Sequence, residues 1–247
     1  MEDISYYPNG KIKERRRYLH GELHCEDGPA VVEYYESGQV KSEKWYRNGT
    51  LHRVNKPAVI EYYESGQVKG ERWFYNGEPH RENQPAIIEY YENGQVKYEA
   101  WYKNGTYHNE NDPAVVHYYE DGQIKHEEWY MNGKPYRKEG STEITYYENG
   151  QIKYELWHNT HGQLHRENGP AAVDYYENGQ IMREEWYNEH LLHREDGPAV
   201  VEYHEDGTVK NKEYYLFNKK MSEEEFFKYV KIKNLIEKTA SGRKIKL

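Results

Sequence analysis

The chain has 247 residues, with 34 Lys and Arg against 43 Asp and Glu, and its formal net charge of −9 argues against a nucleic-acid partner. Aromatic residues make up 15% of the chain, including 28 Tyr and 6 Trp, which indicates a folded protein whose apolar surface is largely aromatic. A single cysteine, Cys25, excludes an internal disulfide framework and a cysteine-only metal site.

Residues 1–23 are predicted to form a partial repeat that caps the N-terminal end of an array. They contain YYPNGKIKERRRYLHGEL, which keeps the turn of the later units but carries Arg17 where those units have Trp. Atypical terminal units are expected at the ends of repeat proteins.

Residues 24–220 are predicted to form seven repeats, because tryptophan and glycine recur at a fixed spacing. Successive tryptophans lie 28 residues apart, except for one interval of 29. The first unit reads HCEDGPAVVEYYESGQVKSEKWYRNGTL, and the extra residue of the fifth unit falls in HNTHGQ, where the other units have a tight turn. An insertion in a turn costs little. The repeated tryptophans are Trp45, Trp73, Trp101, Trp129, Trp157 and Trp186.

Each unit contains two turn signals, Ser-Gly, Asn-Gly or Asp-Gly after Tyr-Tyr-Glu and usually Asn-Gly after Trp-Tyr. Both predict two-residue type I′ hairpin turns. The segments between them are rich in Val, Tyr and Trp and predict two strands per unit. With a two-residue turn at residues 37–38, Tyr35 should lie opposite Val40. The same register places Glu33 opposite Ser42.

Both faces of such a hairpin mix apolar and polar residues, whereas a sandwich would need one plainly apolar face. The predicted fold is therefore an all-β repeat protein, an elongated single-layer antiparallel β-meander with two strands per 28-residue repeat. Each unit should advance the sheet by ~9.6 Å. The HREDGPA-like piece between units is too polar and too rich in Gly and Pro for a central strand, so we expect a loop.

Residues 221–247 break the repeat and predict a C-terminal capping α-helix. The Ser-x-x-Glu motif at residues 222–225 has the spacing of a capping box. We expect Phe226, Phe227 and Val230 to cover the last strand, since an uncovered sheet edge invites strand addition by another molecule.

The recurrent phrases YYENGQVKYEAWYKNG and YYENGQIKYELWHNT resemble the MORN-repeat variants of bacterial and large DNA virus proteins. The resemblance covers residues 5 to about 218, with seven copies in phase. The HREDGPAVVEY extension resembles the 28-residue version rather than the shorter unit of typical MORN proteins, whose YxGxxxxGxxxGxG pattern is not kept. The resemblance implies an elongated scaffold for protein docking, which in the typical family is sometimes dimeric or in contact with acidic phospholipid. Some bacterial relatives of the variant type are described as antitoxin-like.

A histidine begins six of the seven units and is the strongest candidate for a metal ligand. Ligands lie ~2.1 Å from an ion, whereas equivalent atoms of adjacent units should be ~9.6 Å apart, so a shared ion does not fit. We assign these histidines a structural role, with the ring packing near Trp and hydrogen bonding in the HREDGP-like loop. A local cluster of His158, His161 and His165 is the alternative metal site. The repeated histidines are His24, His52, His80, His108, His165 and His193.

No catalytic motif stands out in the chain. Glutamates that recur in every copy belong to a scaffold rather than to a cleft with separated pKa values. No GxSxG, HExxH, P-loop or dinucleotide fingerprint occurs. Cys25 stands where other units have Arg53, Arg81 and Arg166, which we interpret as a solvent-side position. We therefore predict a non-enzymatic protein without cofactor or metal.

One position of the second strand varies from unit to unit inside a constant sequence pattern, and we call it the variable column. Repeat proteins commonly place partner choice at such positions. The pattern predicts an interaction strip that faces solvent or a partner. The predicted strip consists of Ser42, Tyr98, His126, Tyr154 and Arg183, and the same column contains Gly70 and Asn211.

The leading functional hypothesis is a scaffold or protein–protein interaction module whose partner is another protein, with a homodimer as an open alternative. The segment 219–247 has nine Lys and Arg against four Glu, so a membrane-surface tether is the second hypothesis and an antitoxin-like binder the third. The start MEDISYYPNG lacks the features of a signal peptide, and no apolar stretch approaches the ~20 residues of a bilayer span. A cytoplasmic location is therefore predicted.

Overall fold

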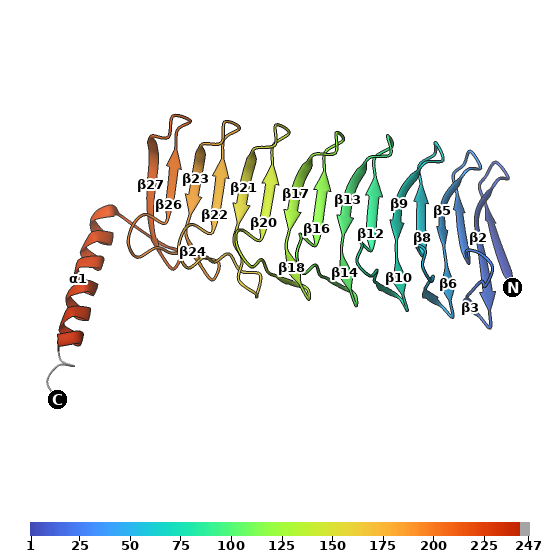
Figure 1. The fold of residues 1–247 in the computed structure, drawn as a ribbon, viewed down its shortest axis with the longest axis horizontal. Coiled ribbons are helices and arrows are strands. Elements are labelled where there is room, and N and C mark those ends of the chain that lie inside the picture. Colours follow the sequence, from blue (N-terminus) through green and yellow to red (C-terminus); the bar gives the residue numbers. More distant parts are fainter. Residues whose placement is uncertain (243–247) are drawn as a thin grey trace. The chain divides into compact units, whose positions relative to one another are not determined.

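The computed structural model describes residues 1–242, with side chains to residue 237, and divides into two compact units. Unit 1 is Met1–Lys134 and unit 2 is Pro135–Leu247. Both are built from antiparallel hairpins that follow one another along the chain (Figure 1).

Unit 1 is one sheet layer in which each longer strand pairs with the next longer strand along the chain. These strands are β1 (Glu2–Tyr6), β2 (Ile12–Leu19), β4 (Val31–Tyr34), β5 (Val40–Lys44), β8 (Val59–Tyr62), β9 (Val68–Arg72), β12 (Ile87–Tyr90), β13 (Val96–Ala100), β16 (Val115–Tyr118) and β17 (Ile124–Glu128). The short strands that follow them are β3 (Glu22–Leu23), β6 (Tyr46–Arg47), β7 (Thr50–Leu51), β10 (Phe74–Tyr75), β11 (Glu78–Pro79), β14 (Tyr102–Lys103), β15 (Thr106–Tyr107), β18 (Tyr130–Met131) and β19 (Lys134–Pro135), the last of which contains the unit boundary.

Unit 2 repeats the same meander and adds the helix. Its longer strands are β20 (Glu143–Tyr146), β21 (Ile152–Leu156), β22 (Ala172–Tyr175), β23 (Ile181–Glu185), β26 (Val200–Tyr203) and β27 (Val209–Leu216). Its short elements are β24 (Tyr187–Asn188), β25 (Leu191–Leu192) and β28 (Lys219–Met221), and the helix is α1 (Glu223–Gly242). The predicted all-β antiparallel repeat architecture with a C-terminal helix is confirmed.

The two turns of each unit have different geometries, so the prediction of two type I′ turns was half wrong. At the Asn-Gly turn, Asn48 and Gly49 have φ angles of 48° and 74°, as a type I′ turn requires. At the other turn, Tyr35 accepts a hydrogen bond from the amide of Gly38 and donates its own amide to Gln39. Only the glycine there has a positive φ, of 98°, which defines a three-residue loop.

The extra loop residue is absorbed by a β-bulge close to the turn. Tyr34, and not Tyr35, lies opposite Val40, whereas Glu33 lies opposite Ser42 as predicted, so Lys41 is left out of the pairing. The same register shift recurs in the other long hairpins. The bulge therefore restores the predicted register. That register decides to which face of the sheet the side chains beyond the bulge point.

Small residues pack where each strand begins. The alanine of every Pro-Ala pair is almost fully buried, and its backbone bonds to both neighbouring strands, as Ala58 does by accepting the amide of Trp45 and donating to Arg72. A larger side chain would separate strands that lie in direct contact. The alanines at this position are Ala30, Ala58, Ala86, Ala114, Ala171 and Ala199.

Helix α1 begins at the predicted capping box but covers less of the sheet than expected. The Ser222 hydroxyl accepts the amide of Glu225, and the Glu225 carboxylate accepts the amide of Ser222. Phe226, 1% exposed, packs against Tyr214. The ring of Phe227 lies 5.9 Å from that of Tyr214 but is 54% exposed, so it covers the last strand only in part.

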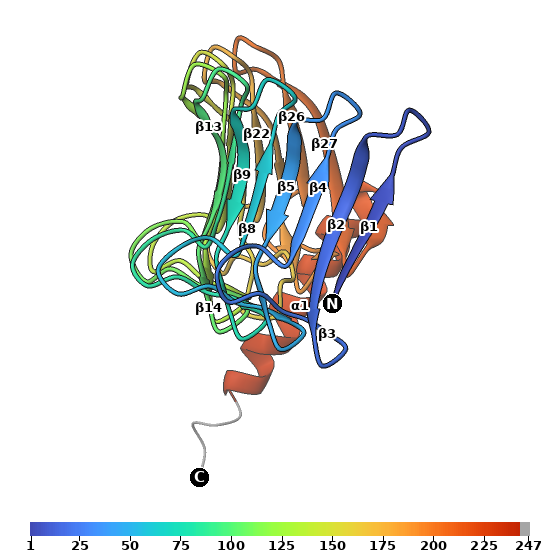
Figure 2. The same cartoon turned by 90° about the vertical axis from the view of Figure 1, so that its right-hand side faces the viewer.

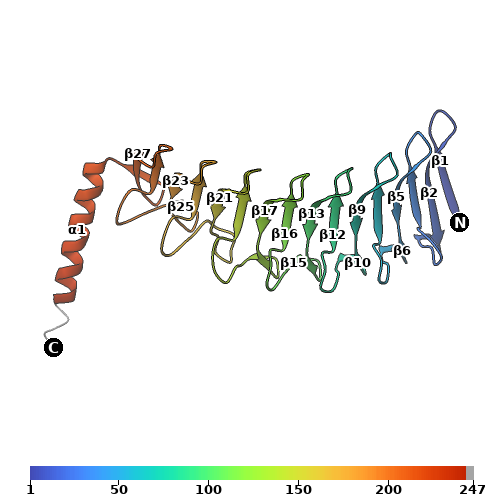
Figure 3. The same ribbon diagram turned by 45° about the horizontal axis from the view of Figure 1, so that its top comes forward.

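Beyond its first turns, α1 extends away from the sheet of unit 2 (Figure 3). Tyr229 and Ile232 are exposed. Only Val230 of the later apolar residues joins the cluster around Tyr214, Leu216 and Phe226. This helix is not long and apolar enough to cross a membrane.

Candidate interaction surface

Each sheet has two chemically distinct faces, because successive residues of a strand point to opposite sides. We call the face that carries the repeated Trp and the return loops the loop face, and the opposite one, with the variable column, the variable face. The return loops project from one side of the sheet (Figure 2). Trp45 and Lys44 illustrate the alternation, since the former stacks with a return loop and the latter pairs with Glu33 on the variable face.

On the loop face, an arginine connects the return loop to the preceding Trp in several repeats, whereas Asn109 takes the place of the arginine after Trp101. The guanidinium of Arg53 lies 3.7 Å from the ring centroid of Trp45, and its Nη1 donates to the carbonyl of Pro57. Burial against the ring lowers the pKa of Arg53. The same stack recurs at Arg81 on Trp73, Arg166 on Trp157 and Arg194 on Trp186.

The interpretation of this arginine position as a solvent-side position was therefore wrong. In the first unit two substitutions occur together, since Cys25 replaces the arginine and Arg17 replaces the tryptophan it would cover. Arg17 Nη1 lies 3.6 Å from the Cys25 sulfur. The first repeat thus keeps a side-chain contact at this place, between Arg17 and Cys25 instead of between a Trp and an Arg.

Tyrosine hydroxyls join each unit to a neighbouring one. The second Tyr of a pair donates to a carbonyl one unit later, as in Tyr35 to Tyr62 at 2.8 Å. The first Tyr of a pair donates to a glutamate of the preceding unit, as in Tyr62 to Glu43 at 2.8 Å. Burial and this carboxylate raise the pKa of Tyr62 to about 12. The pKa values of Tyr90 and Tyr203 are raised to about 12 in the same way.

The repeated histidines have a structural role, but their hydrogen bonds differ from the prediction. The Nδ1 of His24 accepts the amide of Asn48 at 3.1 Å, in the Asn-Gly turn at the end of the same repeat rather than in the adjacent HREDGP-like loop. An Nδ1 that accepts a hydrogen bond requires the neutral ring with its proton on Nε2. The same bond links His52 to Asn76, His80 to Asn104, His108 to Asn132 and His193 to Phe217.

His165, which begins the repeat after the longer HNTHGQ turn, departs from this pattern. Its Nδ1 is buried without a hydrogen-bond partner among the described residues, and His190 instead accepts the amide of Leu164 at 2.7 Å. His158 hydrogen bonds to Thr142 at 3.0 Å. Within the described part of the chain, no group of three or more His, Cys, Asp or Glu side chains is placed to hold a metal ion.

On the variable face of unit 1, the size of the variable-column residue and that of its neighbour compensate each other. Ser42 is 2% exposed, so the expectation that it faces solvent or a partner was wrong. Beside it Lys44 forms a 2.7 Å ion pair with Glu33. Burial alone would raise the pKa of Glu33, but the hydrogen bond and charge of Lys44 hold that pKa below its ordinary value. Gly70 is likewise buried, next to Arg72.

Further along unit 1, larger variable-column residues form an aromatic cluster of Tyr98, Tyr102, Tyr107, His117 and His126. Tyr98 lies 4.7 Å from the ring of His117, which lies 5.6 Å from that of His126. Tyr107 packs on Tyr102 at 4.6 Å. The small Ala100 accompanies the large Tyr98, in the reverse of the arrangement at Ser42 and Lys44.

The aromatic cluster carries perturbed acid and base groups. Burial, followed by the charge of His126, lowers the pKa of His117. His126 Nε2 lies 3.1 Å from a carboxylate oxygen of Glu128, whose other oxygen accepts the Tyr130 hydroxyl at 2.7 Å. These two hydrogen bonds hold the pKa of Glu128 below its ordinary value despite its burial. These residues therefore form a polar and aromatic surface on the variable face.

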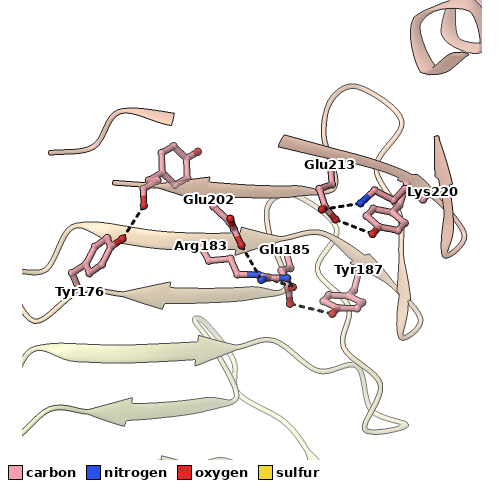
Figure 4. A network of polar contacts seen from close by, with 9 residues as sticks. Tyr176, Arg183, Glu185, Tyr187, Glu202, Glu213 and Lys220 are labelled. Carbon is pink, nitrogen blue, oxygen red and sulfur yellow. Dashed lines mark hydrogen bonds and ion pairs between the residues drawn. The ribbon is translucent and has the colours of Figure 1, made fainter. Parts of the chain in front are cut away.

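In unit 2 the variable column forms an ionic network around Arg183. Arg183 contacts Glu185 and lies 3.2 Å from Glu202, while Tyr187 donates to Glu185 (Figure 4). Burial, followed by the charge of Glu185, raises the pKa of Asp174. One repeat later in the sequence, a further network forms in which Glu213 accepts hydrogen bonds from Lys220 and Tyr215, each at 2.8 Å.

Tyr154, also in unit 2, donates to Glu143 at 3.2 Å. In unit 1 and in unit 2, the residues of the predicted strip thus lie on one face, but their surroundings differ in chemistry and Ser42 is buried. Sequence reasoning missed the adjacent column of Lys44, Arg72 and Glu128, although the alternation of a strand places it on the same face.

The family described as MORN repeat variant matches residues 4–20, 30–48, 58–78, 87–104 and 141–156. A comparison with curated proteins found no match. Among solved structures, the chain resembles the "Crystal Structure of TcdB2-TccC3-Cdc42" with 13% identity, 86% of this chain and 12% of that chain covered, and a TM-score of 0.22. It also resembles "ASR Alternansucrase in complex with isomaltononaose" with 11% identity, 89% and 16% covered, and a TM-score of 0.21. The chain thus spans only 12% and 16% of the lengths of these two structures.

Proposed function

The chain is a MORN-repeat protein of the variant type, and we propose that it is a non-enzymatic scaffold that binds another protein through its variable face. MORN repeats are in general interaction modules for proteins or membranes and are in general non-catalytic. The binding face, the partner class and the absence of catalysis in this chain are the parts that we propose.

The main observation behind the proposal is that the hydrogen bonds between strands and turns repeat along the chain, whereas the residues of the variable column change. The bonds from Tyr35 to Tyr62 and from His24 to Asn48 have counterparts in the other units. On the same strands the variable column changes from a covered serine to an aromatic cluster and then to an Arg183 network. A residue that changes while its backbone stays fixed can alter recognition without altering the fold.

The side chains in and beside the variable column suit a protein partner better than a small molecule. Half-buried tyrosines such as Tyr98 and Tyr102 offer a large contact area at low entropic cost. Arg183, whose charge is already shared with Glu185 and Glu202, offers a polar contact that needs no buried unpaired charge. Aromatic and arginine residues are the ones that dominate protein–protein contacts.

The experiment compares capture of partners from cells that naturally contain the protein. A variable-face variant carries Tyr98→Ser, His126→Ser and Arg183→Ser, and the control Val54→Ser removes a side chain that is 65% exposed in a return loop. We expect the first variant to lose at least about tenfold of the captured partner, as the removal of a binding hot spot does. Circular dichroism confirms that both variants fold. Loss of the partner in the control but not in the variable-face variant would contradict the proposal.

A membrane-surface tether is a second candidate because of one observation on α1. Phe227, Tyr229 and Ile232 are exposed beside Lys228 and Lys231, so the helix presents apolar and basic groups together. Flotation with vesicles of anionic lipid, using the full chain and a Lys228→Glu/Lys231→Glu variant, tests it. Flotation of the full chain that the two substitutions abolish would favour the tether. Absence of flotation would leave the protein scaffold as the function.

A further inference from the structure

We propose that β1 is a docking edge for a second copy of the chain, which gives a two-fold symmetric dimer with the two β1 strands paired antiparallel. This inference concerns the edge of the unit 1 sheet rather than its variable face. It therefore stands independently of the proposed partner protein.

Strand β1 has only one ladder partner within residues 1–242, namely β2. All five of its residues are exposed. The amide of Tyr18 donates to the carbonyl of Met1 at 2.9 Å, and the Met1 amine donates back to Tyr18 at 3.1 Å. Antiparallel pairs alternate between bonded and non-bonded positions. The backbone groups of Glu2 and Ile4 therefore point away from β2.

The interior units show what these outward groups do elsewhere. Ala58, which occupies the position of Glu2 two units later, accepts the amide of Trp45. Tyr34, the equivalent of Tyr6, accepts the hydroxyl of Tyr7. At the β1 edge the corresponding backbone groups have no ladder partner among the described residues. An edge of this kind is a template for a further strand.

The sequence of β1 matches a second copy of itself in one register. With Ile4 opposite Ile4 of the other copy at the two-fold axis, the outward residues Glu2 and Tyr6 face each other across the interface. This is the register that pairs all three outward residues. It sets a carboxylate against a phenol, the same combination that Tyr62 and Glu43 form inside the array.

Charge and exposure favour the same arrangement. The acidic residues Glu2 and Asp3 lie at one end of β1, so an antiparallel copy keeps the acids of the two chains apart, whereas a parallel copy would set them side by side. Ile4 is 37% exposed and Tyr6 58% exposed. Pairing covers both apolar side chains and adds main-chain hydrogen bonds.

Continuation of the array by the opposite end of another copy is less suited to this edge. At the last repeat, His204 stands where other units have the Tyr that donates to the next carbonyl. Lys212 likewise stands where other units have the Glu that accepts the next Tyr hydroxyl. The last strand therefore lacks both side-chain links that an added β1 would use. A closed two-fold dimer also avoids the open polymers of head-to-tail contacts.

A cysteine placed on the symmetry axis tests the pairing in the full chain. In a Cys25→Ser background, Ile4→Cys should form a disulfide-linked dimer under mild oxidation, because bonded antiparallel partners have Cα atoms about 5.5 Å apart, within disulfide range. The matched control Lys210→Cys lies on the exposed part of β27 and should remain monomeric. Equal cross-linking of the two variants, or none at residue 4, would overturn the proposal.

Charge exchange at the same position gives a second readout that needs no cysteine. A residue on a two-fold axis meets itself, so Ile4→Lys and Ile4→Glu should each abolish dimers, whereas an equimolar mixture should restore a species of about twice the 29.8 kDa chain mass. Sedimentation velocity measures the mass at matched concentrations. We expect wild-type dimers to be weak, because a single strand pair buries less than the ~1,200 Å² of a stable interface. A wild-type chain that stays monomeric at every concentration, or a mixture that behaves like either variant alone, would refute the symmetric pairing.

Discussion

The two faces of the sheet, although built from the same strands, differ in how regularly their side-chain contacts repeat. On the loop face, Trp45 beneath Arg53 is one copy of a contact found in several units, at nearly constant distance. On the variable face, Ser42, Tyr98 and Arg183 occupy equivalent positions with unrelated contacts. The loop face thus repeats its side-chain contacts from one repeat to another, whereas the variable face changes them on the same paired strands.

The largest expected effect tests the loop face. Trp73→Ala removes the ring on which Arg81 stacks at 3.8 Å and should lower the free energy of unfolding by about 3–5 kcal/mol, as truncation of a packed aromatic ring does. Denaturant unfolding measures the loss. Arg81→Ala serves as the control, since it keeps the ring and should cost less. A loss below about 1 kcal/mol for Trp73→Ala would mean that the stack does not hold the strands.

The variable face should be less sensitive at its most buried aromatic position. Tyr98→Ala removes the contact with His117, 4.7 Å away, but the neighbouring rings can close over part of the space. We expect a loss of about 1–2 kcal/mol in the free energy of unfolding. Tyr98→Ser gives a matched comparison, because Ser occupies the same column at residue 42. A cost equal to that of Trp73→Ala would remove the distinction between the faces.

A smaller effect isolates one link between units on the loop face. Tyr62→Phe deletes the hydrogen bond to Glu43 while keeping the ring, and should cost about 1 kcal/mol. The raised pKa of Tyr62, about 12, adds a pH signature. Stability that depends on the neutral phenol is complete below the ordinary tyrosine pKa of about 10 and is lost as the pH rises through about 12.

The Tyr62 signature is measured by denaturant unfolding of wild type and Tyr62→Phe as the pH is raised. The difference in stability between the two proteins should shrink across that interval. A difference that stays constant to the highest pH would show that the phenol and Glu43 are not coupled.

The smallest effect is an acid sensitivity of the aromatic cluster. Burial lowers the pKa of His117, so the folded state favours the neutral ring. The corresponding stability is complete above the ordinary histidine pKa of about 6.5 and is lost as the pH falls through the lowered value. Hydrogen exchange of β16 and β17 between about pH 7 and pH 5 should show this loss. His117→Thr, with the residue found at the equivalent Thr145, should flatten the pH slope, and an unchanged slope would assign it to another group.

Most of the fold could be predicted from the 28-residue period of the sequence. Because tryptophan and glycine recur every 28 residues, the strands and the order of the hairpins could be predicted. The register of each strand pair could also be predicted for the part away from the turn. The turn type could not, since Ser37-Gly38 satisfies both a two-residue and a three-residue loop. The choice depends on whether a bulge at Lys41 restores the register, and such a bulge leaves no mark in the composition.

The candidate site was only partly predictable for a related reason. Variation in one column marked the positions on the variable face, but burial depends on the column beside it. Ser42 is buried beside the ion pair of Lys44 and Glu33, whereas the larger Tyr98 stands beside the small Ala100. The hydrogen bonds of the histidines were misassigned because the partner of His24, the amide of Asn48, lies 24 residues away in the turn at the other end of the same repeat. Helix α1 could be placed from its cap, but the exposure of Phe227 depends on the direction in which the helix leaves the sheet.

The links between units also bear on how such a chain can change its length. The bond from Tyr35 reaches Tyr62, 27 residues on, and that from Tyr147 reaches Tyr175, 28 residues on across the longer unit. Among the described residues, these tyrosine-to-carbonyl links join one repeat to the next along the chain, and links such as Tyr62 to Glu43 join a repeat to the one before it. Duplication or loss of a whole unit therefore recreates a junction of the kind already present, whereas loss of half a unit leaves donors without acceptors. The array can accordingly be lengthened or shortened by gene segments that encode complete repeats, with residues 1–23 and the helix left in place.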